Sequence, residues 1–261
     1  MKVKIKKDDK VKEFNLINSW GDVTLEKWVK LAHKDNETKV EETLKVIDTL
    51  TDIPKKLVKQ LGIKDVAVIL NKVSELQEEE NSYLKNIIHI NGKKYGFHPN
   101  FDELTLGEYA DIEMLFRDDI HKNLPELMSI LYRPIVEQKG NVYTIEAYDG
   151  NTTIRAEEFK KMKASMVQGA LFFLVDFRNR ITTDFAIIFD GTDEGDNERV
   201  LGETFAEKWS WFGVMYRLTN GNIVNLDAIT RLNLLECLTW LSYETDLQEN
   251  ENNKLNLDGK Q

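Results

Sequence analysis

The sequence predicts an α+β fold that is predominantly α-helical, with β-hairpins in the N-terminal half and a C-terminal helical bundle. Most of the chain has apolar residues at spacings of three and four, which is typical of amphipathic helices. Three shorter stretches alternate apolar and polar residues around turn residues, which is typical of hairpins. With 261 residues, 41% of them hydrophobic, the chain is long enough to bury a substantial core.

The hairpins are expected around residues 2–17, 86–97 and 136–148. In the first, lysines alternate with Val3 and Ile5 on an exposed strand, and Asp8-Asp9-Lys10 forms the turn. The second contains Asn91-Gly92, the residues that a type I′ turn requires. The third is expected to turn at Gly140-Asn141.

Helices are expected between and after these hairpins, starting at N-cap residues. Thr24 precedes a helix with Leu25 and Trp28 on one side, Asp52 is expected to cap a short helix, and Thr105 caps a helix that reaches about Arg117. The other helices are expected at about 37–50, 63–76, 120–132, 154–162, 165–188, 203–218 and 226–248.

Three domains follow from this pattern: a hairpin-plus-helices module at 1–84, hairpins plus the helical bundle at 85–248, and a mobile tail at 249–261. The stretch Ser165–Phe177 is apolar all round and predicts a central buried helix. Trp209, Trp240 and Phe173 are expected to lie on mutually packed helices of the bundle. The tail is rich in Asn, Glu and Lys, so truncation after Glu249 is expected to leave thermal stability nearly unchanged.

Two stretches of the sequence match each other at a constant offset of 81 residues. Trp20-Gly-Asp-Val-Thr-Leu-Glu-Lys-Trp28 aligns with Phe101-Asp-Glu-Leu-Thr-Leu-Gly-Glu-Tyr109. Each follows an expected hairpin and leads into a helix. The first aromatic residue precedes the cap, as in a hydrophobic staple. Both a duplicated unit and two independent capped helices explain this match.

The charge of the chain is unevenly distributed. Residues 1–100 hold 19 Lys and Arg against 16 Asp and Glu, whereas residues 101–261 hold 16 against 29. Binding to a phosphate backbone needs a cationic surface, so the acidic part argues against a nucleic-acid-binding protein. No signal peptide and no membrane-spanning stretch is expected, and the single Cys237 excludes an intramolecular disulfide, which fits a reducing cytoplasm.

Metal sites and catalytic motifs are not indicated. His89 and His98 lie on the Asn91-Gly92 hairpin, where they could face each other across the strands, but two surface strand residues are the favoured explanation. The acidic run Asp190–Glu198 resembles a calcium loop, but Leu201 stands where the bidentate Glu belongs. Because the sequence has no P-loop, GxGxxG, GxSxG or HExxH motif, we expect no catalytic residue, no cofactor and no metal.

An aromatic cluster on the helix at 203–218 is the candidate partner-binding site. Its members are Trp209, Trp211, Phe212 and Tyr216. At 3.6 residues per turn, these four cannot all point to the same side of a helix. Core packing is expected for most of them, and one or two rings are left to face a partner.

Several stretches resemble a group of tailed-bacteriophage proteins from the virion and tail region, some of which are tail assembly chaperones. The likeness covers about residues 85–245 and is carried by Lys208–Tyr216, Leu218–Ile223, Asp227–Ile229, Leu238–Glu244, Ser129–Ile135, Val167–Leu174 and Leu104–Tyr109. These are packing and capping patterns, and residues 1–80 match less clearly.

The resemblance implies a helper protein that binds a virion component in the host cytoplasm, such as the helical tape-measure protein, without catalysis. A structural virion component, such as a tail-completion or connector-region protein, is the alternative that the resemblance leaves open. A third class, an enzyme acting on nucleic acid, predicts a cationic groove, and the acidic balance of residues 101–261 speaks against it.

Overall fold

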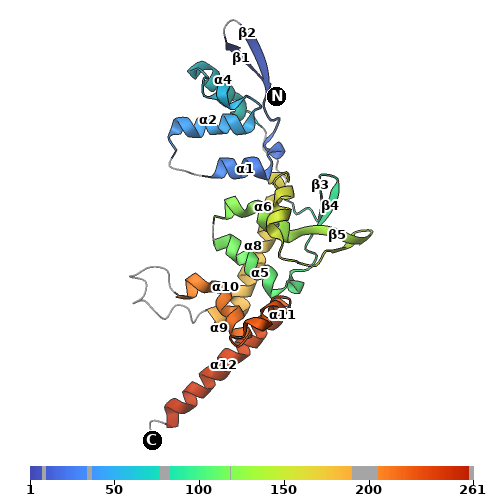
Figure 1. The fold of residues 1–261 in the computed structure, drawn as a ribbon, viewed down its shortest axis with the longest axis vertical. Helices are drawn as coiled ribbons and strands as arrows, with labels where there is room; N and C mark the ends of the chain where they lie inside the picture. The colour runs from blue at the N-terminus through green and yellow to red at the C-terminus, as the bar shows by residue number, and fades with distance from the viewer. Residues whose placement is uncertain (8–9, 34–36, 77–82, 118, 190–204, 259–261) are drawn as a thin grey trace. The chain divides into compact units, whose positions relative to one another are not determined.

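The structure is a computed structural model, which describes residues 1–7, 10–33, 37–76, 83–117, 119–189 and 205–258. It confirms the predicted α+β class, with all strands in the first half and helices toward the C-terminus (Figure 1). The chain forms two compact units: unit 1 contains residues 1–97 and 118–171, and unit 2 contains residues 98–117 and 172–261. This division differs from the expected boundary near residue 84, because backbone hydrogen bonds join residues on either side of it: the Leu25 N–H donates to Met162 O and the Glu26 N–H donates to Lys160 O.

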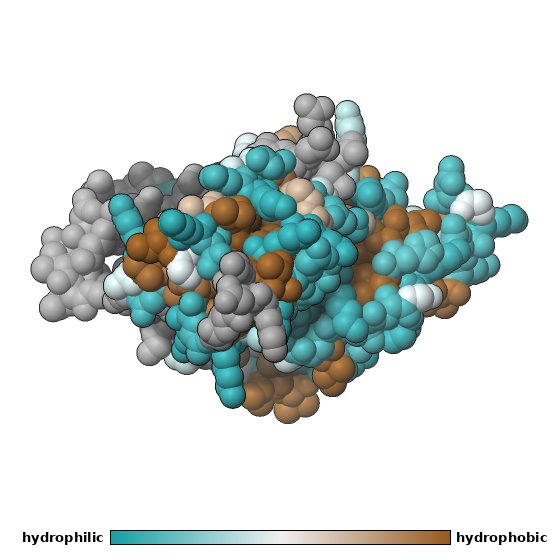
Figure 2. All heavy atoms as spheres, turned by 90° about the horizontal axis from the view of Figure 1, so that it is seen from above, coloured by the Kyte–Doolittle hydropathy of each residue, from teal (hydrophilic) through white to brown (hydrophobic). Residues whose placement is uncertain are grey.

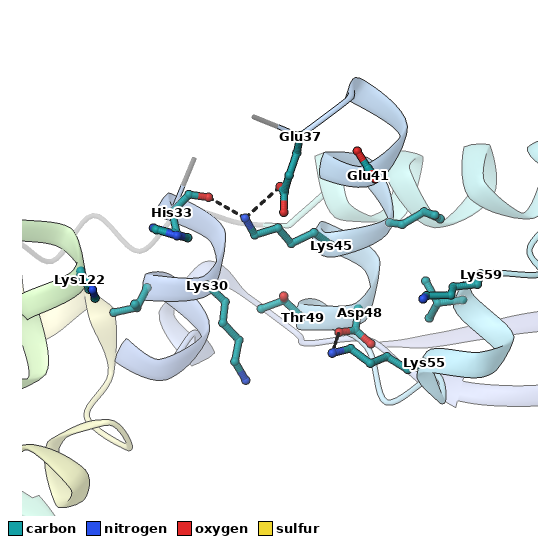
Figure 3. Close-up of a pocket in the computed structure, with 13 residues that line it drawn as sticks. Lys30, His33, Glu37, Glu41, Lys45, Asp48, Thr49, Lys55, Lys59 and Lys122 are labelled. Atoms are coloured by element: carbon teal, nitrogen blue, oxygen red, sulfur yellow. Dashed lines mark hydrogen bonds and ion pairs between the residues drawn. The ribbon is translucent and has the colours of Figure 1, made fainter. Parts of the chain in front are cut away.

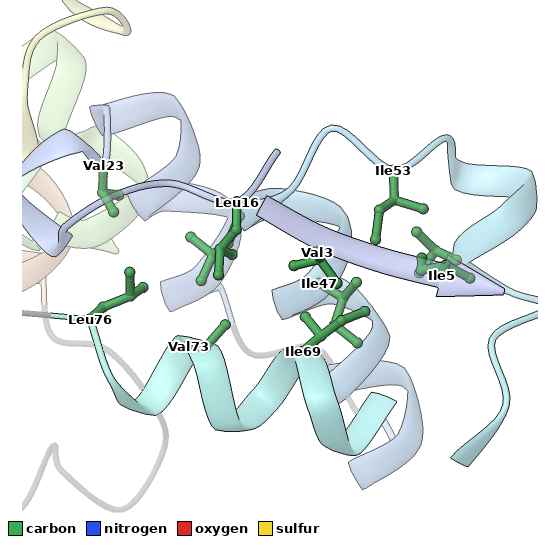
Figure 4. Close-up of a cluster of buried hydrophobic side chains, with 11 residues drawn as sticks. Val3, Ile5, Leu16, Val23, Ile47, Ile53, Ile69, Val73 and Leu76 are labelled. Atoms are coloured by element: carbon green, nitrogen blue, oxygen red, sulfur yellow. The ribbon is translucent and has the colours of Figure 1, made fainter. Parts of the chain in front are cut away.

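Unit 1 begins with the predicted hairpin, formed by β1 (Lys2–Lys7) and β2 (Lys10–Asn15). The strands pair antiparallel with Val3 opposite Phe14, and the expected turn residues Asp8 and Asp9 lie outside the described part of the chain. The alternation predicted for β1 is confirmed, since Lys2 and Lys4 are exposed while the apolar residues between and after them are buried. Those apolar side chains join a cluster with α2 and α4 (Figure 4); its buried members are Val3, Ile5, Leu16, Val23, Ile47, Leu50, Ile53, Val58, Ile69, Val73 and Leu76.

Four helices and one 3-10 turn follow this hairpin: η1 (Trp20–Asp22), α1 (Leu25–Ala32), α2 (Lys39–Leu50), α3 (Lys55–Val58) and α4 (Ile63–Ser74). The cap predicted at Thr24 is confirmed, and α2 starts with a capping box between Thr38 and Glu41. The cap predicted at Asp52 is wrong. Its carboxylate accepts hydrogen bonds from the backbone N–H and side-chain amide of Asn15, both at 2.6 Å, and therefore ties the hairpin to the α2–α3 loop.

The second and third predicted hairpins join into one antiparallel sheet of four strands, in the order β3 (Ile87–Ile90), β4 (Lys93–Phe97), β5 (Tyr132–Lys139) and β6 (Val142–Ile145). Asn91 and Gly92 have φ values of 51° and 80°, as the predicted type I′ turn requires. The rest of unit 1 consists of α6 (Ile120–Leu131), α7 (Thr152–Phe159), the 3-10 turn η3 (Ala164–Met166) and residues 167–171 of α8 (Val167–Asp184).

Unit 2 is helical. It contains η2 (Phe101–Glu103), α5 (Leu106–Arg117), residues 172–184 of α8 (Val167–Asp184), α9 (Ala186–Phe189), α10 (Phe205–Leu218), η5 (Ile223–Asn225), α11 (Leu226–Thr230) and α12 (Leu234–Asp258). Their apolar faces form one cluster, whose buried members are Leu104, Leu106, Tyr109, Phe177, Ile181, Leu234, Cys237 and Leu238.

Three expectations about the C-terminal helices are wrong. The helix expected at 226–248 is interrupted at 231–233, where a short bridge replaces helix, and α12 then continues to Asp258. Residues 249–258, expected to be a mobile tail, are therefore helical. The helix at Ser165–Phe177 is not buried all round, since Phe172 is 74% exposed while Leu174 is fully buried. Its apolar sequence suggested a central helix, but part of its surface faces solvent.

Candidate functional site

The two matching stretches at 20–28 and 101–109, called the first and second motif below, fold in the same way. Each consists of a 3-10 turn, one extended residue that forms an isolated bridge, and an α-helix. The bridging residues are Thr24, opposite Lys163, and Thr105, opposite Asn233. The constant offset of 81 residues in sequence is thus also a correspondence in structure.

The backbone hydrogen bonds of the two motifs are equivalent. In unit 1, the Leu25 N–H donates to Met162 O at 2.8 Å, and the Ala164 N–H donates to Val23 O at 2.8 Å. In unit 2, the Leu106 N–H donates to Leu232 O at 2.9 Å, and the Leu234 N–H donates to Leu104 O at 2.9 Å. Each motif is therefore clamped to a turn between two helices, α7–α8 in one case and α11–α12 in the other. The partner segments correspond at an offset of 70 residues.

An apolar groove lies beside the first motif, within unit 1. Its volume is about 670 Å³, and its walls come from η1, α1, the start of α6 and the start of α8. We call it the aromatic groove, because Trp20 and Trp28 line it; the other lining residues are Gly21, Val23, Leu25, Ile120, His121, Leu124, Ala164, Ser165, Val167, Gln168 and Leu171. Trp28 is 38% exposed, which is unusual for so large an apolar side chain. The groove can therefore accept an apolar side chain from outside the unit.

The corresponding face of the second motif is filled by the chain itself. Phe177 of α8 makes edge-to-face contacts with Phe101 and Tyr109, with ring centroids 5.3 and 5.9 Å apart. Trp211 of α10 packs on Tyr109 at 5.0 Å in the same way. As a result Tyr109 is 3% exposed, whereas its counterpart Trp28 remains open. The two motifs share a backbone and differ in what covers them.

The aromatic cluster predicted as a partner-binding site is split between two faces of α10. Trp211 packs against the core of unit 2, whereas Trp209, Phe212 and Tyr216 are 42%, 49% and 62% exposed. Trp209 and Phe212 contact each other, with ring centroids 5.6 Å apart. Three rings thus form an exposed aromatic face on α10. Hydrophobic residues also reach the molecular surface in patches bordered by hydrophilic residues in Figure 2.

Trp209, Trp240 and Phe173 lie on α10, α12 and α8, whose apolar faces share the core of unit 2, but the expectation that these three side chains face that core is wrong. Trp240 is 65% exposed and Phe173 is 52% exposed. On α12 the buried positions are instead Leu234, Cys237, Leu238 and Leu241, which follow a narrow stripe with spacings of three, one and three residues. The stripe places Trp240 and Tyr243 on the opposite side of the helix. The size of the aromatic rings suggested that they are buried. The positions of the buried leucines along α12, however, decide which side of the helix faces the core.

A second pocket of about 630 Å³ lies between α1, α2, α3 and α6 of unit 1 (Figure 3). Its charged lining residues are Lys30, His33, Glu37, Glu41, Lys45, Asp48, Lys55, Lys59 and Lys122. The Lys45 ammonium donates to Glu37 at 3.0 Å and to the carbonyl of His33 at 2.6 Å, and Lys55 lies 3.8 Å from Asp48. These carboxylates offset much of the positive charge. The pocket therefore has no concentrated field for an anionic ligand.

The two candidate histidines do not face each other across a hairpin. His89 lies opposite Lys94, and its side chain is exposed. His98 follows β4 and is buried, with its Nε2 atom 3.9 Å from a Glu108 carboxylate oxygen. That carboxylate belongs to a capping box, since Glu108 accepts from the Thr105 N–H at 2.7 Å and Thr105 Oγ1 accepts from the Glu108 N–H at 3.2 Å. The buried Glu108 has a structural role at the start of α5.

Tyr95 and Cys237, whose pKa values are raised, also have structural surroundings. Burial and a hydrogen bond to Glu158 raise the pKa of Tyr95, so its phenol stays protonated and holds α7 to β4. Lys93 donates to the same carboxylate at 2.7 Å. Burial raises the pKa of the Cys237 thiol to about 11, which leaves little thiolate at neutral pH. Neither group is poised as a nucleophile or a base.

Among the residues that the structure describes, no three His, Cys, Asp or Glu side chains gather closely enough to hold a metal ion. The acidic run Asp190–Glu198 lies outside the described residues, as does Leu201. Within the described ranges, none of the helices is both long enough and apolar enough to cross a bilayer.

The aromatic groove was not predicted, although a signal for it was present. The repeat of residues 20–28 at 101–109 identifies both motifs in the sequence. The aromatic residues at the two ends of the repeat are the ones that other helices cover in the second motif. The partner segments at 160–164 and 231–234 share hydrogen bonds but little side-chain identity, so the sequence does not reveal them. The chain matches no family model, and no curated protein or solved structure is significantly similar to it.

Proposed function

We propose that this chain is a tail assembly chaperone of a tailed bacteriophage, which binds a virion protein reversibly and catalyses no reaction. The single observation that carries the protein-binding part is the open aromatic groove of unit 1, whose counterpart in unit 2 is covered by a helix. An amphipathic helix of a partner docks by placing its apolar face in a hydrophobic groove. The likeness of residues 85–245 to phage tail-region proteins supplies the biological setting.

The exposed aromatic face of α10 supports the same proposal. Trp209, Phe212 and Tyr216 present three rings toward solvent, and tryptophan and tyrosine are enriched among residues that dominate binding energy. A virion protein such as the helical tape-measure protein offers apolar helix faces that such rings can cover. The buried polar groups Glu108, Tyr95 and Cys237 all have structural surroundings, which is compatible with a protein that acts by binding.

Co-expression with the tape-measure protein of the same phage tests this function. We expect the two proteins to co-purify, and we expect the chain to be missing from purified virions when these are examined by mass spectrometry. A double variant, Trp209→Ala with Phe212→Ala, should reduce co-purification. Ile154→Ala is the matched control, since Ile154 is also an exposed apolar residue on a helix, α7, in the other unit.

Stoichiometric presence of the chain in mature particles would instead favour the second candidate, a structural virion component. The observation that favours this candidate is the apolar surface of α12, where Trp240, Tyr243 and Leu247 are 65%, 64% and 44% exposed. A permanent neighbour in the virion would cover such a surface. The two candidates thus predict opposite outcomes in the same mass-spectrometry experiment.

A further inference from the structure

We propose that the exposed side of α12 binds a basic amphipathic α-helix of a partner protein, as one helix of a coiled coil binds another. This inference rests on the protein-binding function proposed above and names the chemistry of the partner. It is argued from three features of α12: an aromatic stripe, the acidic residues beside this stripe, and a length of helix that extends beyond the core of unit 2.

Trp240, Tyr243 and Leu247 form an apolar stripe on the exposed side of α12, called the α12 stripe below. Their spacings of three and four residues are those of successive a, d and a positions in a heptad, so the three side chains share one side of the helix. All three are exposed, whereas Leu238 joins the core of unit 2 from the opposite side of the helix. Tryptophan and tyrosine are enriched among the residues that dominate binding energy, so this stripe is suited to a partner.

The charged residues that border the centre of the α12 stripe are acidic. With Trp240 at position a of a heptad, Glu244 and Glu251 take position e. Asp246 takes position g, and charges at e and g positions select the partner of a coiled-coil helix. Glu244 accepts from Arg217 of α10 at 2.8 Å, so its charge is partly offset within the unit. Asp246 and Glu251 are exposed and therefore present most of the charge that a docking helix meets.

The basic residues of α12 do not cancel this charge. Residues 236–254 contain five Asp and Glu against a single Lys. That lysine, Lys254, takes an a position two turns beyond Leu247, so it borders the C-terminal end of the stripe rather than its centre. Because complementary charges steer and align two surfaces, a helix with lysines or arginines beside its own apolar stripe fits α12 best.

A second copy of this chain is a poor occupant of the α12 stripe. In a parallel pair of α12 helices, Asp246 of one copy would face Glu251 of the other, and in an antiparallel pair Asp246 would face its own equivalent. Like charges across a contact disfavour both arrangements. The acidic e and g positions therefore select against pairing of α12 with itself and in favour of a helix of opposite charge.

The C-terminal part of α12 extends beyond the core of unit 2 (Figure 1). Every residue from Asp246 to Lys254 is exposed, whereas Leu241, little more than one turn earlier, is fully buried. So short a length of helix gains little stability on its own in water, since most helical stability in proteins comes from packing of an apolar face. A partner helix on the α12 stripe would supply that packing.

Peptide binding to the full chain tests the proposal. Two synthetic peptides of about three heptads carry leucine at every a and d position, and they differ only at the e and g positions, which are lysine in one and glutamate in the other. Each peptide repels its own copies, so it stays available to bind the chain. We expect the basic peptide to bind about tenfold more tightly than the acidic one, or better, in calorimetry at physiological salt.

Variants of α12 locate the site. Asp246→Lys with Glu251→Lys reverses both exposed charges beside the stripe, so the acidic peptide should then bind about tenfold more tightly than the basic one. Glu249→Lys is the matched control, because it makes the same kind of change on the same helix at position c, away from the stripe, and should change either affinity less than about threefold. Trp240→Ala with Leu247→Ala removes two exposed stripe side chains and should abolish binding of the basic peptide.

Three results would overturn the proposal. The first is equal affinity of the chain for the two peptides. The second is an unchanged preference after the charges of Asp246 and Glu251 are reversed. The third is a dimer of the chain alone in sedimentation that Trp240→Ala with Leu247→Ala dissociates, since the stripe would then belong to a second copy.

Co-purification separates this inference from the proposed function. If the basic peptide binds as expected and no virion protein co-purifies with the chain, the α12 inference stands and the chaperone function fails. If a virion protein co-purifies equally well with the charge-reversed double variant, the chaperone function stands and the α12 inference fails.

Discussion

The first and second motifs share one backbone arrangement, but other helices cover the aromatic residues of the second motif only. Both begin with a 3-10 turn, both bridge to a turn between two helices, and both form the same pair of backbone hydrogen bonds. In unit 2 the aromatic ends are sealed by Phe177 and Trp211, whereas in unit 1 they line an open groove. The same backbone arrangement can thus serve stability in one place and leave its apolar face available for binding in the other. We therefore expect substitutions at equivalent positions of the two motifs to change the free energy of unfolding by different amounts.

The largest difference is expected at the equivalent positions 109 and 28. Tyr109→Ala removes a ring that is 3% exposed and contacts two other rings, so it should lower the free energy of unfolding by about 3–5 kcal/mol. Trp28→Ala removes a larger ring that is 38% exposed and should cost only about 1–2 kcal/mol. Chemical denaturation followed by circular dichroism measures both.

Tyr109→Phe is the matched control, because it keeps the ring contacts and should retain most of the stability. If Trp28→Ala proves as destabilising as Tyr109→Ala, the first motif is a core element and the contrast between the two motifs fails.

The ion pair that holds α8 to α5 should give the next largest effect. Arg178→Met keeps an apolar stem over Phe116, whose ring lies 4.4 Å from the guanidinium carbon, but leaves the mostly buried Glu113 without this partner. We expect a loss of about 2–3 kcal/mol in unfolding free energy, because a buried carboxylate stays without its counter-charge. Replacement of both residues, Arg178→Met with Glu113→Leu, should recover much of it. A double variant less stable than the single one would show that the pair does more than satisfy its own charges.

Local features of the fold were predictable because they depend on neighbouring residues. Thr24 and Thr105 start helices, and Asn91-Gly92 turns a hairpin, since cap and turn geometry restrict which residues fit. Pairing of β4 with β5 was not predictable, because no local pattern links residues 35 positions apart. The exposure of Trp240 was not predicted for a similar reason. The side of α12 that is buried depends on which helices pack against it, and this is known only from the tertiary structure.

The candidate site was predictable only in part. The aromatic residues of α10 were identified from their spacing, and the structure divides them into one core ring, Trp211, and three exposed rings. The aromatic groove depends on residues from three separate segments of the chain, 20–28, 120–124 and 164–171. Its clearest signal in the sequence was the repeated motif, which marks the backbone arrangement but not whether a helix covers it.

Position 107 offers a smaller test of the difference between the motifs. A Cβ at Gly107 would lie 3.0 Å from the carbonyl oxygen of Thr230, whereas its counterpart Glu26 is exposed and accepts from Lys30 at 2.9 Å. Gly107→Glu should therefore cost about 1–2 kcal/mol of unfolding free energy through crowding against α11, despite the better helix propensity of glutamate. Glu26→Gly is the reciprocal variant and should cost about 1 kcal/mol through helix propensity alone. Thermal denaturation compares the two, and a stabilised Gly107→Glu variant would mean that α5 and α11 separate easily.

The smallest effect is expected at the third residue of the capping box. Glu108 completes a box with Thr105, whereas its counterpart Lys27 leaves Thr24 with a single hydrogen bond of 3.4 Å. Lys27→Glu should complete the box in α1 and place a carboxylate near the positive end of the helix, which together stabilise by about 0.5–1 kcal/mol.

Lys27→Gln is the control for this last prediction. It keeps a side chain that can complete the box but adds no negative charge near the positive end of the helix, so it should stabilise the chain less than Lys27→Glu does. If neither variant is more stable than the unaltered chain, the capping partner at the third helical position does not distinguish the two motifs energetically.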